Sequence, residues 1–222
     1  MKDRGRFESC HPKEDEALRE ATKIAVLVSG GGTNLQALID AQKAGLLKNG
    51  EICLVLSGTA GAYALTRAEN AGIAAVTVDR KKCADRKEFE EKILSVLEEY
   101  GIELIVLAGF MQILSAEFTS RWPERMINVH PSLIPSFCGA GFYGLHVHEA
   151  ALEYGVKVTG ATVHFVNEVP DGGRIIAQKA VEIEEGDTPE ILQKRVMEKA
   201  EWILLPQAVE KVSAAIRKGE KI

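Results

Sequence analysis

The sequence lacks long hydrophobic runs and has few cysteines. No stretch approaches the ~20 apolar residues that a membrane-spanning helix needs, and charged residues follow the basic start where a secretory signal would place its apolar segment. The four cysteines lie far apart and include no Cys-x-x-Cys pair, which argues against a zinc knuckle or a disulfide framework. We therefore predict a cytoplasmic protein that inserts into no membrane and binds no metal.

Positive charge is also in deficit. Lysine and arginine total 27, aspartate and glutamate total 32, and the formal net charge is -5 at pH 7. The field of such a chain repels polyanions instead of collecting them. Nucleic acid is therefore not an expected partner. We expect small-molecule ligands, with the choice between monomer and homodimer left open.

The 222 residues fit one domain, residues 23–222, preceded by a charged N-terminal extension of residues 1–22. From Lys23 onward, apolar runs alternate with segments of helical spacing. Strands are predicted at 24–28, 52–56, 74–78, 104–108 and 126–130. Strands that alternate with helices predict an α/β fold: a mostly parallel twisted sheet with helices on both faces.

The pattern changes after Pro135. Two β-rich stretches, 156–166 and 174–183, are separated by Pro-Asp-Gly-Gly, which predicts antiparallel strands added at one edge of the sheet. Thr188 and Pro189 are a typical N-cap and first-turn pair, so a long C-terminal helix begins there. We expect this helix to bend or break near Pro206, because proline lacks the backbone N–H.

A glycine-rich loop, Ser29-Gly-Gly-Gly-Thr-Asn34, joins the first strand to the first helix. Unpaired backbone N–H groups and the positive end of the helix dipole converge at such a position and favour an anion. The spacing matches neither G-x-G-x-x-G nor G-K-[ST], which favours a single phosphate over a dinucleotide. The alternative is a glycine turn needed only for tight packing of strand on helix.

Three polar residues in the second half of the sequence suggest catalysis. Asn128 and His130 flank one residue at the end of a predicted strand, so both side chains lie on one face of the sheet. An amide and an imidazole there can hold a developing oxyanion, and Asp171, in the turn between the late strands, can reach and charge the ring. The alternatives are a capped strand end, a core histidine and an Asp-Gly hairpin turn.

Six ordered sequence blocks together carry a resemblance. They are 28–36, 107–114, 128–135, 144–148, 160–166 and 171–173. Over roughly residues 23–217 the chain resembles the folate-dependent glycinamide ribonucleotide formyltransferases of purine synthesis. The resemblance implies a Rossmann-like formyltransferase fold. It also implies transfer of the formyl group of 10-formyltetrahydrofolate, as co-substrate, to the amine of 5-phosphoribosylglycinamide.

The resemblance also implies residue roles. Asn128, His130 and Asp171 would be catalytic. Gly32, Thr33 and Asn34 would bind the substrate phosphate, and Glu201 another part of that substrate. The folate would contact Arg86, Met111, Gln112, Ile113, Leu114, Asn128, Asn167, Glu168, Val169 and Pro170.

The sequence departs from the family pattern in places. The segment 136–143 is longer than usual, Gln112 replaces a common arginine, and Arg174 replaces a common proline. We expect altered folate affinity and an unaltered catalytic set. A formyl-folate hydrolase with the same catalytic set, an initiator-tRNA formyltransferase and a nucleotide-binding regulatory module are the rival hypotheses.

Two further histidine features carry other expectations. His146, His148 and Cys138 form a weak potential metal set that we do not expect to bind metal. His164, in the middle of a predicted strand, is expected to be a hydrogen-bonded structural histidine near the site and not a direct catalyst.

Overall fold

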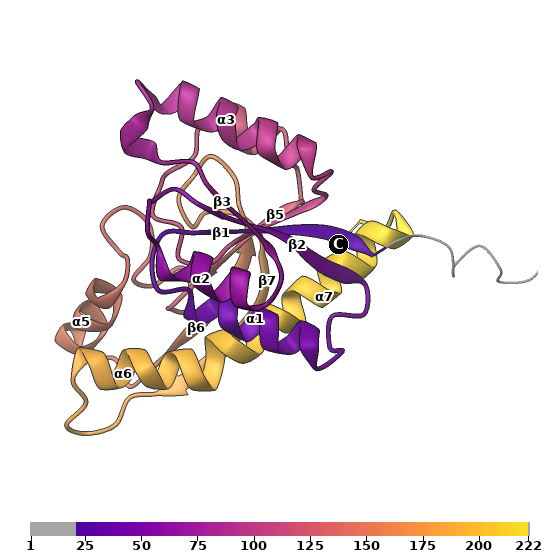
Figure 1. Cartoon of the computed structure of the whole chain (residues 1–222). Coiled ribbons are helices and arrows are strands. Elements are labelled where there is room, and N and C mark those ends of the chain that lie inside the picture. The colour runs from indigo at the N-terminus through magenta and orange to yellow at the C-terminus, as the bar shows by residue number, and fades with distance from the viewer. Residues whose placement is uncertain (1–20, 222) are drawn as a thin grey trace, which may run out of the picture.

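The computed structural model describes residues 21–221, in which seven strands form one sheet (Figure 1). The strands are β1 (Thr22–Val28), β2 (Gly50–Ser57), β3 (Ala74–Thr77), β4 (Leu104–Leu107), β5 (Met126–His130), β6 (Val158–Phe165) and β7 (Ile175–Glu182). Their order in the sheet is β3-β2-β1-β4-β5-β6-β7. Strand β1 begins at Thr22, and most of the extension expected for residues 1–22 lies outside the described residues.

Strands β1 to β5 pair in parallel, whereas β6 is antiparallel to β5 and β7 is antiparallel to β6. The predicted mostly parallel sheet with an antiparallel edge is confirmed. The register of the first antiparallel pair sets Asn128 opposite His164 and His130 opposite Thr162. This register sets Thr162, in the middle of β6, beside the carboxyl end of β5, and the chain leaves β6 opposite Ile127.

Helices cover both faces of the sheet. They are α1 (Thr33–Lys43), α2 (Tyr63–Asn70), α3 (Arg86–Glu99), α4 (Ala116–Ser120), α5 (Leu145–Tyr154), α6 (Pro189–Val196) and α7 (Trp202–Lys218), with short 3-10 and π turns at Arg80–Lys82 and Met197–Glu201. Figure 1 shows α3 on one side of the sheet and α1, α2 and α7 on the other. Asp85 and Thr188 cap α3 and α6 as the sequence predicted, with side chains that accept from Glu88 N and Ile191 N.

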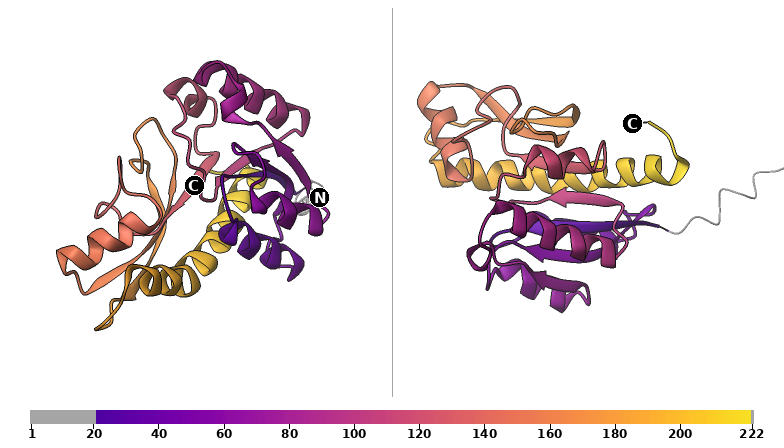
Figure 2. Two further views of the ribbon diagram at one scale, coloured as in Figure 1. Left: turned by 60° about the vertical axis from the view of Figure 1, so that its left-hand side comes forward. Right: turned by 90° about the horizontal axis from the view of Figure 1, so that it is seen from above.

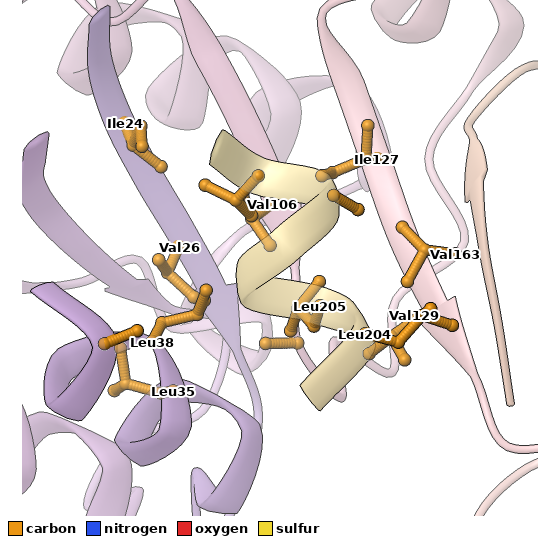
Figure 3. Packing of buried hydrophobic residues seen from close by; sticks show 14 of the residues in the cluster. Ile24, Val26, Leu35, Leu38, Val106, Ile127, Val129, Val163, Leu204 and Leu205 are labelled. Atoms are coloured by element: carbon orange, nitrogen blue, oxygen red, sulfur yellow. The ribbon is translucent and has the colours of Figure 1, made fainter. Parts of the chain in front are cut away.

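The two faces of the sheet carry separate hydrophobic clusters. Ile24 and Val26 of β1 point into the cluster shared with α1, α2, α6 and α7, where Leu35, Leu38 and Leu205 are fully buried (Figure 3). Ala25 and Leu27, the alternate residues, point into the cluster formed with α3 and α4. Both faces of β1 are therefore buried, which explains why its sequence is an uninterrupted apolar run.

The C-terminal helical segment is irregular before Pro206 and not at it. Residues Met197–Glu201 form a π turn between α6 and α7, and Pro206 lies inside α7 (Figures 1 and 2). The expected break is thus displaced toward the N-terminus. The α-helical acceptor for residue 206 is the carbonyl of Trp202, the first residue of α7, so the missing N–H falls where the regular helix begins. No helix among residues 21–221 is both long and apolar enough to cross a bilayer.

Candidate functional site

The polar residues expected at the carboxyl edge of the sheet meet in the structure. Strand β5 ends with Asn128 and His130, and Asp171 comes from the loop between β6 and β7. Asp171 Oδ1 lies 3.5 Å from Asn128 Nδ2, and its Oδ2 lies 3.5 Å from His130 Nδ1. An amide, an imidazole and a carboxylate are therefore adjacent, although 43 positions separate Asn128 from Asp171.

His164, expected to be a hydrogen-bonded histidine near the site, lies in contact with two members of this cluster. Its Nδ1–H donates to the carbonyl oxygen of Phe165 at 2.8 Å, and its Nε2 lies 3.2 Å from Asn128 Nδ2. The same Nε2 lies 3.5 Å from Asp171 Oδ1. His164 therefore orients both the amide and the carboxylate. The signal for this role is its register opposite Asn128, which the sequence alone does not fix.

His130 is buried, and both of its ring nitrogens have neighbours. Its Nε2–H donates to the carbonyl oxygen of Phe137 at 2.8 Å, and its Nδ1 faces Asp171. Burial lowers the pKa of His130, while the Asp171 carboxylate and the Phe137 carbonyl act in the opposite direction, and the net shift is downward. A neutral ring with an unprotonated Nδ1 beside a carboxylate can accept a proton there and form an ion pair.

Asp171 is held in its ionised form. Burial alone would raise the pKa of its carboxyl, but the hydrogen bond with His164, the backbone N–H of Gly139 and the nearby His130 together hold that pKa below its usual range. The Gly139 N–H donates to Oδ2 at 2.8 Å. The backbone of Asp171 has a φ of 54°, in the left-handed region that aspartate tolerates better than most residues.

Gly173 fixes the path of the loop that carries Asp171. A Cβ atom at this position would overlap the carbonyl oxygen of Phe165, so only glycine lets the chain pass there. The Arg174 carbonyl oxygen accepts from Phe165 N at 2.9 Å directly beside this close approach. The run Asp171-Gly172-Gly173 therefore places the Asp171 carboxylate beside His130 and fixes the start of the chain that returns as β7.

The segment 136–143, longer than in the family pattern, folds back over His130. Ser132 Oγ donates to the Ser136 carbonyl at 2.6 Å, and the Phe137 ring packs edge-on against Phe142 and Tyr154. Phe137 has a φ of 49°, an uncommon backbone conformation for an aromatic residue. This segment supplies the two backbone groups that contact His130 and Asp171, a role that no sequence pattern predicts.

The glycine loop follows β1, two strands away from β5 in the sheet, and leads into α1. The loop residue Gly32 has a φ of 71° and precedes the first turn of α1. Asn34 Nδ2 donates to Glu201 Oε2 at 2.6 Å, and Thr33 Oγ1 lies 3.8 Å from Met197 Sδ. The structure therefore joins the first turn of α1 to the π turn before α7 and brings Glu201 to Asn34.

A pocket of about 130 Å³ opens beside the cluster of Asn128, His130 and Asp171. It is lined by Leu107, Phe110, Gln112, Ile113, Leu114, Thr119, Asn128, His164, Val166, Asn167, Glu168, Val169, Pro170 and Asp171. Two residues expected near a folate do not line it. Met111 is half-exposed and donates its backbone N–H to Ser29 Oγ at 3.0 Å, and Arg86 lies on α3 with its Nε 3.8 Å from Glu90. All other residues expected to contact a folate line this pocket.

Besides His130 and His164, the described histidines are His146 and His148, which lie outside the cluster. Among residues 21–221 no group of three or more His, Cys, Asp or Glu side chains is arranged to hold a metal. His146 contacts Glu149 Oε2 at 2.8 Å, whereas His148 is buried. Burial, followed by the nearby His130, lowers the pKa of His148 to about 4.

The chemistry available at this edge is proton transfer and stabilisation of an oxyanion. Asn128 offers amide N–H groups, His130 offers an imidazole that takes a proton, and Asp171 stabilises the charged ring. The pocket borders the cluster, and the glycine loop lies at the end of β1 on the same carboxyl edge of the sheet. A two-substrate reaction fits this layout.

Comparison with known proteins finds one matching family and several similar proteins. Residues 22–209 match the formyl transferase family. The trifunctional purine biosynthetic protein adenosine-3 of Gallus gallus is 49% identical over 199 residues, which are 89% of this chain and 19% of that protein. The chain thus spans about a fifth of the length of such trifunctional relatives.

Relatives of similar length also match. The phosphoribosylglycinamide formyltransferase of Haemophilus influenzae is 41% identical over 187 residues, covering 84% of this chain and 85% of that protein. The crystal structure of glycinamide ribonucleotide transformylase 1 from Symbiobacterium toebii superposes with a TM-score of 0.81 at 39% identity, covering 90% of this chain and 89% of the other.

Proposed function

The chain belongs to the formyl transferase family, and on that premise we propose that it moves the formyl group of 10-formyltetrahydrofolate to the amine of 5-phosphoribosylglycinamide. The products are the N-formyl ribonucleotide and tetrahydrofolate, a step in de novo purine biosynthesis. The observation that carries the proposal is the contact among Asn128, His130 and Asp171 beside a mostly apolar pocket.

The reaction begins when the glycinamide nitrogen attacks the formyl carbon. The carbonyl oxygen becomes an oxyanion, which Asn128 Nδ2 and His130 Nε2–H stabilise. Because Nε2–H donates to Phe137 in this structure, the formyl oxygen has to replace that carbonyl as acceptor. The carbon–nitrogen bond to the folate then breaks.

His130 and Asp171 carry out the proton transfers that the reaction requires. The attacking amine loses a proton and the leaving folate nitrogen gains one, directly or through water. His130 has a lowered pKa and is neutral at the start, so it can take the proton at Nδ1, where the ionised Asp171 stabilises the imidazolium. His164 keeps the carboxylate and the amide of Asn128 in place.

We assign the binding residues from the resemblance and the geometry together. Gly32, Thr33 and Asn34 hold the phosphate and Glu201 contacts the same ribonucleotide. The folate lies in the pocket of Gln112 to Leu114 and Asn167 to Pro170, with Met111 at its rim and Arg86 near the glutamate tail. The protein acts in the cytoplasm as a monomer or homodimer and requires no metal.

The test is an assay of formyl-folate consumption with and without 5-phosphoribosylglycinamide. Transfer predicts consumption only when the amine substrate is present, and formation of the N-formyl product in equal amount. Consumption at the same rate without the amine would replace the proposal by folate hydrolysis.

His130→Ala in the same assay tests the catalytic assignment. Removal of the imidazole should lower turnover by about 100-fold to 10,000-fold, the usual range for acid–base and oxyanion contributions. His146→Ala is the control, because that half-exposed ring contacts Glu149 and lies outside the cluster. Near-normal turnover of the His130 variant would remove His130 from the mechanism.

A further inference from the structure

Two consecutive carbonyl groups of the glycine loop are tied to helix α2. The backbone N–H of Ala64 donates to the Gly30 oxygen at 3.1 Å, and Nε–H of Arg67 donates to the Gly31 oxygen at 2.8 Å. Both donors belong to α2 (Tyr63–Asn70), which packs beside α1 on the same face of the sheet. The loop is therefore held from the side of α2.

These two bonds orient the amides of the loop. In a trans peptide the C=O and N–H bonds point in opposite directions, and the peptides that follow Gly30 and Gly31 are both trans. Fixing these carbonyls toward α2 turns the N–H groups of Gly31 and Gly32 away from it. Within residues 21–221 neither N–H donates to another group of the protein, so both face the space in front of the first turn of α1. Successive free N–H groups of this kind form an anion-binding concavity.

We propose that Arg67 is a positioning residue for the substrate phosphate. It fixes the Gly31 carbonyl, so that the loop amides are aimed at the phosphate before it binds. This inference rests on the proposed function and extends it to a residue outside the loop.

The guanidinium of Arg67 is well held for this role. Its Nη1 donates to Gln36 Oε1 at 2.9 Å, and its Cζ lies 5.0 Å from the centroid of the Tyr63 ring. Gln36 is in turn bonded to Asp40 Oδ1 at 2.9 Å. The planar fork of arginine makes the bonds to Gly31 and Gln36 at once, which a lysine ammonium at the same place cannot reproduce.

The loop also lies too close to α2 for any residue but glycine at position 32. A Cβ atom there would lie 2.6 Å from the Cβ of Ala64, and the φ of 71° is unfavourable for other residues. Close packing and two hydrogen bonds thus hold one loop conformation. A preorganised site of this kind affects ground-state binding of the phosphate and leaves the formyl group untouched, so it changes KM and not kcat.

The experiment compares Arg67→Met, Arg67→Lys and wild type. Methionine keeps the apolar stem over Tyr63 and removes the donors, whereas lysine keeps the charge and loses the fork. Arg80→Met is the matched control, since Arg80 also lies over an aromatic ring, Phe89 at 5.9 Å, and donates to a backbone carbonyl, that of Cys83 at 3.3 Å. Circular dichroism verifies folding; should Arg67→Met unfold, Arg67→Lys decides by the same measurements.

Two readouts are taken: the Kd for inorganic phosphate by calorimetry, and KM and kcat for 5-phosphoribosylglycinamide and its dephosphorylated counterpart. Arg67→Met should weaken phosphate binding and raise KM for the phosphorylated substrate by about 10-fold or more, the loss usual for one charge-assisted hydrogen bond. Its kcat should stay within about 2-fold, and kcat/KM for the dephosphorylated compound should not change. Arg67→Lys should be intermediate and Arg80→Met should equal wild type.

The outcomes separate this inference from the proposed function. Phosphate affinity that is equal in Arg67→Met and wild type would overturn the inference, as would a fall in kcat at unchanged KM or no phosphate binding by wild type. If phosphate binding depends on Arg67 but wild type transfers no formyl group, the proposed function fails and the positioning role stands.

Discussion

The carboxyl group of Glu201 is almost completely enclosed between α1 and the π turn, with Asn34 as its hydrogen-bond partner. Burial raises the pKa of this carboxyl to about 7, and the bond from Asn34 opposes the rise only in part. Near neutral pH the residue therefore changes between a protonated and an ionised form. A ligand that reaches it meets a group whose charge depends on conditions close to those of the cell.

We predict that Glu201 makes the stability of the fold fall as pH rises. Its pKa in the folded protein lies above the ordinary value of 4.5. Its contribution to the free energy of unfolding is therefore fully present below about pH 4.5 and is lost as the pH rises through about 7. Relative to Glu201→Gln, wild type should lose on the order of 3 kcal/mol of unfolding free energy between pH 5 and pH 8, at about 1.4 kcal/mol per pKa unit. Urea unfolding at several pH values measures this difference.

Glu198→Gln serves as the control, because Glu198 lies on the same π turn with a half-exposed side chain. Its unfolding free energy should follow wild type at every pH. Parallel curves for wild type and Glu201→Gln would show that Glu201 is ionised throughout and would contradict the prediction.

The position of a site residue could be predicted from the sequence where the geometry of a single strand or turn determines it. Asn128 and His130 share a face because strand side chains alternate, and that much follows from the sequence. The role of His164 did not follow, because it depends on which residue of β6 lies opposite Asn128. The hydrogen bond from Arg67 to the glycine loop was not predictable either, since it arises from the packing of α2 against a loop 36 positions away.

The element that decides the reach of Asp171 is the loop between β6 and β7. It crosses the end of β6 at Gly173, where a side chain would collide with the Phe165 carbonyl. A collision with backbone cannot be relieved by a rotamer change, so the whole loop has to move. Movement there carries Asp171 away from His130.

Gly173→Ala should therefore damage both stability and turnover. We expect a loss of roughly 1–3 kcal/mol in unfolding free energy, typical of overpacking, and a fall in kcat as Asp171 leaves the ring of His130. Gly186→Ala is the comparison, because Gly186 has open space around it, so that alanine there strains only the backbone, whose φ is 83°. That variant should lose about 1 kcal/mol and keep its kcat. Equal kcat for the two variants would show that the loop tolerates the displacement.

The types of element were predictable, but their exact ends and irregularities were less so. Apolar runs and caps such as Asp85 and Thr188 identify strands and helix starts from local chemistry. The π turn at Met197–Glu201 was not predicted, because the missing N–H of Pro206 led us to expect the irregularity at residue 206 itself. The fold of segment 136–143 depends on contacts with His130, Asp171 and Tyr154, which lie far along the chain.

At the scale of the whole molecule, one sheet separates two hydrophobic clusters. Leu205 of α7 is fully buried on one face, and Ile93 of α3 is fully buried on the other. The strand order places β1 in the middle of the parallel part, so both clusters share its backbone. Alternating strands and helices predict this layered arrangement, whereas the order of strands depends on crossovers that no local pattern specifies.

Leu205→Ala and Ile93→Ala should each lower the free energy of unfolding by about 2–5 kcal/mol through lost burial and a cavity. Because the two side chains belong to separate clusters, the double variant should lose the sum of the single losses to within about 0.5 kcal/mol. Urea unfolding of the four proteins gives the comparison. A clear departure from additivity would mean that the sheet transmits repacking from one cluster to the other.

The bond between Asn34 and Glu201 spans 167 positions of the chain. During synthesis on the ribosome, α1 and the glycine loop emerge long before their partner, so a nascent chain cannot form this bond until residue 201 has been made. A chain arrested before residue 201 could already contain the parallel strands and would still leave the first turn of α1 without its hydrogen bond to Glu201.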